Sequence, residues 1–252
     1  MTMLPALRAP ASAPAIADLA EAYARANGPL IRLLNRFATT LERQMAALPA
    51  GVQPQIDRAV VAALTAAHGL AGLAESGPDL GHTGTMAAAL ATGAAGGAGG
   101  LTTSLAELPV TITVFLHAIR REALAAGYDP NEPGIRAACL EVFASGSPLA
   151  RDDGVNTAFL SARLTLSAPA IQKLIASVAP RLAAAMGQKL ALQALPVIGA
   201  VTGAALNATY LNYYRELARI RFALMRLAET GSGEAVVAAF ARAVQTRRVG
   251  KG

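Results

Sequence analysis

The sequence predicts an all-α protein that folds as a single multi-helix domain around a central pair of helices rich in small residues. Of its 252 residues, 54% are apolar and 15% are charged, so the chain can bury a large core. Aromatic residues make up only 4% of the chain, Trp is absent, and alanine dominates the apolar content. Because alanine favours helix but supplies little bulk, such helices have to pack closely.

Apolar residues recur at helical spacing between proline and glycine breakers along most of the chain. A first helix stops at Gly28, and Ser232 is placed to cap the last one. The other expected helices cover approximately residues 29–48, 54–76, 109–126, 135–145, 156–167, 169–193, 195–229 and 234–244.

The stretch from residue 83 to residue 106 is uncharged and rich in glycine. Pairs such as Gly93 with Gly97 lie four residues apart, which permits close helix approach but is also typical of a flexible loop. The β-branched run PVTITVFL that follows would suit a strand on its own. Its continuation into LHAIRREALAAG favours a helix that starts at Pro109, since proline is preferred in the first turn.

A second uncharged stretch runs from Leu190 through Tyr214, long enough to span a membrane. Its proline, glycines and asparagines dilute the hydrophobicity, and Gly199, Gly203 and Asn207 share one helical face. We therefore expect a buried central helix that packs against residues 83–106. Two alternatives stay open, namely a membrane-inserted hairpin of the two stretches and a ligand site around Asn207.

The expected domain organisation is a flexible leader over residues 1–13, one helical domain over 14–246 and a disordered basic tail over 247–252. The N-terminus lacks the clean apolar core of a signal peptide. The single cysteine, Cys139, excludes an internal disulfide, fits a reducing cytoplasm and lies on an apolar helix face. We expect a cytoplasmic protein, with attachment to the inner face of the cytoplasmic membrane left open.

The net charge of +6 is concentrated toward the C-terminus. After Tyr214, Arg215, Arg219 and Arg226 fall within a narrow arc of the expected helix, opposite an apolar stripe. This pattern suits contact with an anionic membrane surface or a membrane-protein partner, and equally a surface helix docked on the core. Few aromatic side chains interleave with the arginines, so we expect no nucleic-acid partner. The oligomeric state is not predicted.

The sequence lacks the common motifs for phosphate binding, zinc hydrolysis and nucleophilic serine or cysteine chemistry. Its three histidines are scattered, and we expect no metal site and no cofactor. Glu107, just before Pro109, is explained by the favourable interaction of a carboxylate with a helix N-terminus. If a buried polar ligand site exists, the residues expected to line it are Asn207, Glu107, His117 and Tyr214.

Three blocks of the chain together resemble the EcsC family, a group of bacterial proteins named for one encoded beside an ABC transporter. They are the Gly/Ala-rich stretch leading into LAELPVTITVFLHAIRREALAAGYD, then IRAACLEVFASG with the following DDG and AFLSAR, and finally ALPVIGAVTGAALNATYLNYYRELARIRFALMRL. The resemblance covers roughly residues 83 to 230. It implies a link to membranes or transport-associated processes but no reaction or substrate.

Two classes of function follow from these observations. The first is a non-enzymatic helical accessory protein, peripherally associated with the membrane and linked to a transport or envelope process. The second is an enzyme or a small-molecule or lipid carrier with a buried polar site among the helices. Whether the protein is an enzyme is left undecided by the sequence.

Overall fold

The computed structural model describes residues 13–26, 49–69, 81–98, 100–145, 168–193, 199–229 and 232–249, and every regular element among them is helical. The all-α prediction is confirmed. The elements are α1 (Ala13–Ala26), α4 (Val52–Gly69), α5 (Gly81–Ala98), α6 (Gly100–Ala125), α7 (Pro133–Glu141), the short 3-10 helix η3 (Val142–Ser145), α8 (Ala168–Gln193), α9 (Gly199–Glu229) and α10 (Gly233–Val249). The helices expected at 29–48 and 156–167, and the expected helix start at Leu195, lie outside the described residues.

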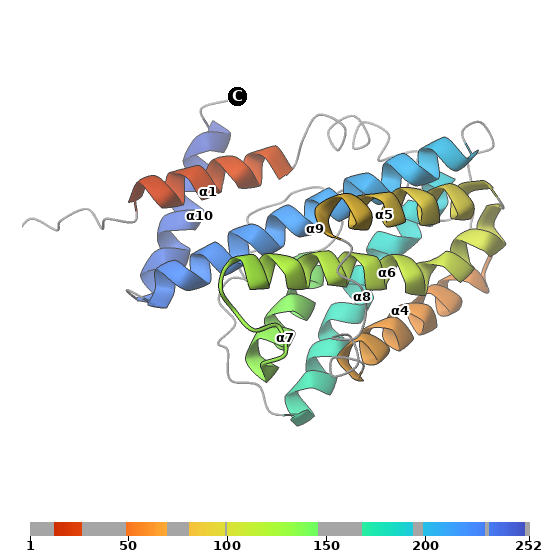
Figure 1. Ribbon diagram of the computed structural model, residues 1–252, viewed down its shortest axis with the longest axis horizontal. Coiled ribbons are helices and arrows are strands. Elements are labelled where there is room, and N and C mark those ends of the chain that lie inside the picture. Colours follow the sequence, from red (N-terminus) through yellow and green to blue (C-terminus); the bar gives the residue numbers. More distant parts are fainter. Residues whose placement is uncertain are drawn as a thin grey trace, which may run out of the picture.

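Three helices, α5, α6 and α9, run side by side along the long axis of the molecule (Figure 1). The α5–α6 junction and the start of α9 lie at one end, so α6 and α9 run in the same direction and α5 runs against both. Helices α4 and α8 pack together and against α6, whereas α1 and α10 pack on each other and on α9, at the opposite end. One hydrophobic cluster draws on all of these helices, as expected for a single domain.

The most extensive contact between elements joins α5 to α9. These are the two small-residue-rich stretches predicted to pair, and the prediction of a central helix pair is confirmed. Helix α5 contains no Asp, Glu, Lys or Arg. Its buried residues are all small, namely Thr85, Ala89, Gly93, Gly96 and Gly97.

The predicted helix start at Pro109 was wrong. Helix α6 begins at Gly100 and continues through Pro109 to Ala125. A proline inside a helix removes one backbone hydrogen bond and costs about 3 kcal/mol. Both sides of the proline are anchored, since Ser104 before it and Ile112 after it are fully buried. Packing of the preceding turns against α5 and the rest of the core therefore overrides the local preference for a helix start.

The ends of two helices follow local rules. After α6, Gly127 has a φ of +82°, and the backbone N–H of Tyr128 donates to the carbonyl of Ala123 at 3.0 Å. Helices commonly end in this way, because glycine adopts the left-handed backbone conformation without steric cost. The hydroxyl of Ser232 accepts from the backbone N–H of Ala235 at 3.4 Å, so Ser232 caps α10 as predicted. Helix α10 reaches Val249, three residues into the segment predicted to be a tail.

Candidate functional site

The pairing of α5 with α9 depends on two glycines that lie face to face. A Cβ atom built on Gly93 would lie only 2.6 Å from the carbonyl carbon of Gly203 and 2.9 Å from the backbone nitrogen of Ala204. No side chain fits between backbones at these distances. The glycines therefore set how closely α9 approaches α5, and they position the polar side chains of the next turns.

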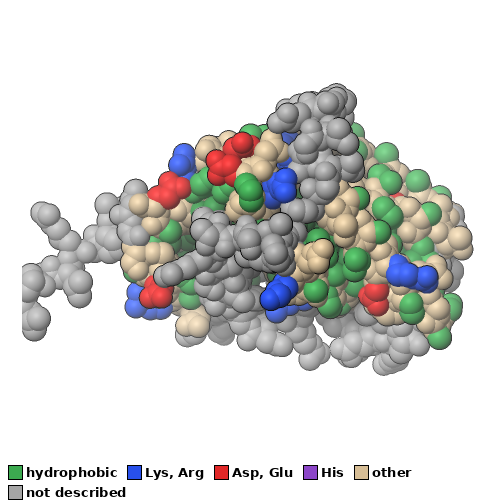
Figure 2. All heavy atoms as spheres, turned by 90° about the horizontal axis from the view of Figure 1, so that it is seen from below, with side chains coloured by type: hydrophobic (Ala, Val, Ile, Leu, Met, Phe, Trp, Pro, Cys, Tyr) green, Lys and Arg blue, Asp and Glu red, His purple; other side chains and the backbone are tan. Residues whose placement is uncertain are grey.

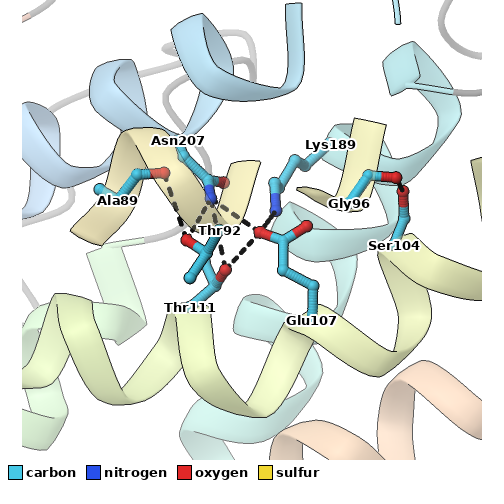
Figure 3. Close-up of polar contacts among 8 residues, drawn as sticks. All are labelled: Ala89, Thr92, Gly96, Ser104, Glu107, Thr111, Lys189 and Asn207. Atoms are coloured by element: carbon cyan, nitrogen blue, oxygen red, sulfur yellow. Dashed lines mark hydrogen bonds and ion pairs between the residues drawn. The ribbon is translucent and has the colours of Figure 1, made fainter. Parts of the chain in front are cut away.

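One turn further along, five polar side chains from four helices converge, and we call them the Glu107 cluster: Thr92 from α5, Glu107 and Thr111 from α6, Lys189 from α8 and Asn207 from α9 (Figure 3). Three donors share one carboxylate oxygen. Glu107 Oε1 accepts from Lys189 Nζ at 2.9 Å, from Asn207 Nδ2 at 2.7 Å and from Thr111 Oγ1 at 2.5 Å. Asn207 Nδ2 also lies 3.1 Å from Thr92 Oγ1, so the cluster ties all four helices together.

The other carboxylate oxygen of Glu107 occupies a space that glycine provides. A Cβ on Gly96 would lie 2.8 Å from Glu107 Cδ and closer still to Oε2. Glu107 Oε2 and Asn207 Oδ1 find no hydrogen-bond partner among the described residues. Ser104, one turn before Glu107, donates to the backbone carbonyl of Gly96 at 2.8 Å, and this hydrogen bond links the start of α6 to the last turn of α5.

Apart from the half-buried Thr92, the Glu107 cluster is closed to bulk solvent. Lys189 and Asn207 are 0% exposed and Glu107 is 8% exposed. Burial lowers the pKa of Lys189, and the neighbouring Glu107 carboxylate opposes that shift. A buried ion pair is costly to desolvate but very costly to break, because the remaining charge then has no partner. The cluster thus favours one relative placement of α6, α8 and α9, and a reacting molecule would reach it only if these helices separated.

The structure brings two of the four predicted ligand-site residues together and separates the other two. Glu107 and Asn207 share a hydrogen bond, 100 residues apart in the chain. His117 lies ten residues beyond Glu107 on α6, about 15 Å along the helix axis. Tyr214 lies two turns beyond Asn207 in an aromatic group, with its ring centroid 5.0 Å from that of Phe143 and 5.8 Å from that of Phe115.

The interpretation of Glu107 as a residue near a helix start was wrong, since it lies well inside α6 and pairs with Lys189. Lys189 was not predicted at all. The sequence does contain a signal, because Lys189 is the one charged residue between Arg181 and Arg215 in an otherwise uncharged run. Such a lysine is seldom buried without a partner. Sequence pattern alone does not show which of the chain's carboxylates that partner is.

The residues of the Glu107 cluster, from Thr92 to Asn207, all lie in a region that matches a known family. The model of the EcsC protein family matches residues 82–227. The chain belongs to the EcsC family. The match spans α5 to α9 and contains the whole Glu107 cluster, whereas α1, α4 and α10 lie outside it. Comparisons with curated proteins and with solved structures returned no match.

The predicted basic stripe of this EcsC-family protein lies on α9, opposite a buried apolar face formed by Leu217, Ile220 and Leu224. Each arginine of the stripe has an acidic neighbour. Arg215 Nε lies 3.6 Å from Glu122 Oε1, Arg219 Nε lies 3.0 Å from Glu216 Oε2, and Arg226 Nη1 lies 3.1 Å from Glu229 Oε2. The helix is therefore docked on the core with its cations largely compensated.

A second buried ion pair joins α7 to α9 in the EcsC-family region. Arg221, almost fully buried, donates to Glu141 and also lies close to Cys139. Burial raises the pKa of Glu141, which the nearby guanidinium opposes. Burial also raises the pKa of Cys139 to about 12, so the thiol stays protonated at neutral pH and is unsuited to nucleophilic chemistry. Among the described residues, no group of His, Cys, Asp and Glu converges to hold a metal ion.

Charge changes at one level along the EcsC-family helices. Arg215 of α9 contacts His82 at the start of α5 and pairs with Glu122 of α6, so these three residues mark a common level. On one side of it, residues 83–98 of α5 and 199–214 of α9 carry no charge. On the same side α6 carries only the buried Glu107 until Arg120 and Arg121, which lie within one turn of Glu122. We call this part of the three helices the uncharged end.

Proposed function

We propose that this EcsC-family protein is a non-enzymatic accessory protein that attaches to the cytoplasmic face of a membrane through its uncharged end. In this proposal it serves a transport or envelope process, in line with the membrane-associated processes that the family resemblance implies. The observation that carries the proposal is the change from uncharged to charged surface at the level of His82, Glu122 and Arg215.

The dimensions of the uncharged end suit a bilayer. Residues 83–98 and 199–214 are 16-residue stretches of helix, each about 24 Å long at 1.5 Å per residue. The hydrocarbon core of a bilayer is about 30 Å thick. Within α6, the segment Thr102–Ala125 is long and apolar enough to cross a membrane, with a mean hydropathy of 1.3. Half of this apolar stretch, however, is buried inside the protein. These lengths support contact or shallow insertion of one end.

The surface of the uncharged end is apolar as well as uncharged. Leu90 on α5 is 41% exposed and Val110 on α6 is 51% exposed, and the exposed residues around them are mainly alanine and threonine. Seen from below, hydrophobic and uncharged polar side chains dominate the right-hand end of the molecule, apart from one small charged patch (Figure 2). Most acidic and basic side chains in that view lie toward the other end. Glu107, Thr111, Lys189 and Asn207 of the Glu107 cluster are buried inside the protein and do not contribute to this surface.

Vesicle flotation with the full-length protein tests the proposal. We expect the wild-type chain to float with phosphatidylethanolamine–phosphatidylglycerol vesicles in both low and high salt, because apolar contact is insensitive to screening. Val110→Glu places a charge on the uncharged end. It should reduce the floating fraction roughly tenfold, given the cost of moving a carboxylate into the membrane.

Leu124→Glu is the matched control, because Leu124 lies on the same helix and is 58% exposed. It lies beyond Glu122, on the other side of the level marked by His82, Glu122 and Arg215, which we call the charged end. This variant should float like the wild type, and both variants should melt at the wild-type temperature. Equal flotation of the two variants would contradict the orientation proposed. Flotation that vanishes in high salt would instead assign the contact to the arginines of α9.

A second function, binding of a small polar or lipid-like molecule at the Glu107 cluster, is favoured by one observation. Glu107 Oε2 and Asn207 Oδ1 are buried acceptors without partners among the described residues, and a ligand with two donors would satisfy both. Native mass spectrometry of the purified full chain tests this. A bound molecule that is lost in Asn207→Leu would support the carrier function, and a bare protein mass would count against it.

A further inference from the structure

The charged end of the molecule carries a groove of about 640 Å³ between α1, α6 and α9. Its walls are formed by Leu19 and Ala15 on one side and by Ala125 and Ala126 on the other, and Ala223 lies on its floor. Four of these five side chains are alanines, which let a partner approach the helix backbones closely. Charged groups lie around this apolar centre.

Two arginines lie on the floor of the groove, at Arg219 and Arg226 of α9. They are seven residues apart, which is two helical turns or about 10.5 Å. Ala223 lies between them, on the same face. Arg226 is also held in place by the ring of Tyr128, whose centroid lies 5.1 Å from the guanidinium carbon. The floor therefore presents two cations at a fixed spacing with an apolar step between them.

Both cations are paired within α9 but remain partly exposed to a partner. Their acidic neighbours, Glu216 and Glu229, lie on the same helix three residues away, and the side chains of Arg219 and Arg226 are 48% and 51% exposed. Exposed pairs of this kind contribute little to stability, so a partner carboxylate can replace either one.

The walls carry one carboxylate each, and these have different surroundings. Glu122 on α6 already pairs with Arg215. Asp18 on α1 is exposed at the rim of the groove. A partner that carries a basic residue on the flank facing α1 would match Asp18.

We propose that this groove binds an amphipathic helix of a partner protein, with an apolar ridge of small or medium side chains and two carboxylates seven residues apart. The ridge packs on Ala223 and Leu227, and the carboxylates pair with Arg219 and Arg226. The spacing decides between this partner and a single-chain amphiphile, because one head group can reach only one of two cations 10 Å apart. The groove lies at the end opposite the uncharged end, so a partner helix reaches it from water.

Fluorescence anisotropy with a labelled synthetic peptide and the full-length protein tests the proposal without any membrane. The acidic peptide has a leucine–alanine ridge and two glutamates seven residues apart, and a second peptide has glutamine at both positions. We expect the acidic peptide to bind about tenfold more tightly than the glutamine peptide, and its affinity to fall with added salt. Arg219→Glu combined with Arg226→Glu should abolish this preference and transfer it to a peptide with two lysines.

Ala125→Phe fills the groove from an exposed position and should prevent binding, whereas Ala62→Phe, on the exposed face of α4, is its control. Circular dichroism of each variant separates a blocked groove from a misfolded chain. Absence of binding, or equal binding of the acidic and lysine peptides, overturns the proposal. Binding of dodecylphosphocholine in the groove would also overturn it, if Ala125→Phe blocks that binding and the acidic peptide does not displace the detergent. That result would assign the groove to amphiphiles. Because no vesicle is present, these outcomes are independent of the flotation result.

Discussion

Lys189 and Glu107 form an ion pair with Nζ and Oε1 2.9 Å apart, inside the protein core. The two residues are 82 positions apart in the chain and come from α8 and α6. Asn207 of α9 donates to the same carboxylate oxygen. One buried carboxylate thus connects three helices whose apolar faces, rich in alanine, would otherwise slide past one another at little cost.

Breaking this pair from one side should be more damaging than replacing both partners. Lys189→Met leaves the Glu107 carboxylate buried without its cation, and we expect a loss of about 3–5 kcal/mol in the free energy of unfolding. Adding Glu107→Leu removes that buried charge, so the double variant should recover at least half of the loss. Urea denaturation of the four proteins measures the coupling. Additive losses would show that the two side chains act separately.

Replacement of Gly93 should disturb the α5–α9 contact even by one methyl group. A Cβ there meets the backbone of Gly203, which has no side chain that can move aside. We expect Gly93→Ala to cost about 1–3 kcal/mol or more, and Gly203→Leu to prevent stable folding. Gly233→Ala is the control, because its Cβ would lie 3.8 Å from the nearest side chain. If thermal melts give Gly93→Ala the same melting temperature as this control, the close approach of the α5 and α9 backbones is refuted.

The effect of replacing Gly96 should depend on Glu107. A Cβ on Gly96 collides with the Glu107 carboxylate and with no other group within the same distance. In a double-mutant cycle, Gly96→Ala should be destabilising in the wild-type chain and much less so in Glu107→Ala. A coupling of about 1–3 kcal/mol is typical of residues in such contact. A coupling near zero would mean that the carboxylate moves aside freely.

Stability should fall in mildly acidic solution because of His117. Burial, helped by the nearby Arg120, lowers the pKa of His117 below 6.5. Between that lowered pKa and 6.5 the unfolded chain binds more protons than the folded one, so the free energy of unfolding decreases as the pH decreases. His117→Gln should flatten this part of the profile. The melting temperatures of the wild type and of His117→Gln are measured from neutral pH downward. Parallel pH profiles for the two proteins would contradict a role of His117.

Helical periodicity was sufficient to predict the long elements α8 and α9 and the burial of the apolar face of α9. The reason is local, since an amphipathic helix shows its buried face in the spacing of its own residues. The small-residue pairing of α5 with α9 was also predictable. Uncharged helices with glycines at four-residue spacing can bury enough surface only against each other.

Local preference failed at Pro109 and Glu107. The sequence around them is typical of a helix start, yet α6 begins nine residues earlier, at Gly100. Burial of the turn that contains Ser104, and the ion pair of Glu107 with Lys189, offset the backbone hydrogen bond that Pro109 removes. A tertiary contact of this kind has no counterpart in the spacing of neighbouring residues.

The sequence by itself determined the helical class, the two uncharged small-residue stretches and the basic stripe of α9, because each depends on residues within a few turns of one another. Only the tertiary structure decided that Lys189, Asn207 and Glu107 meet and that Tyr214 and His117 stand apart from them. It also decided that His82, Glu122 and Arg215 lie at one level. Periodicity tells which face of a helix is buried, but the register between helices is set by side-chain packing across residues distant in the chain.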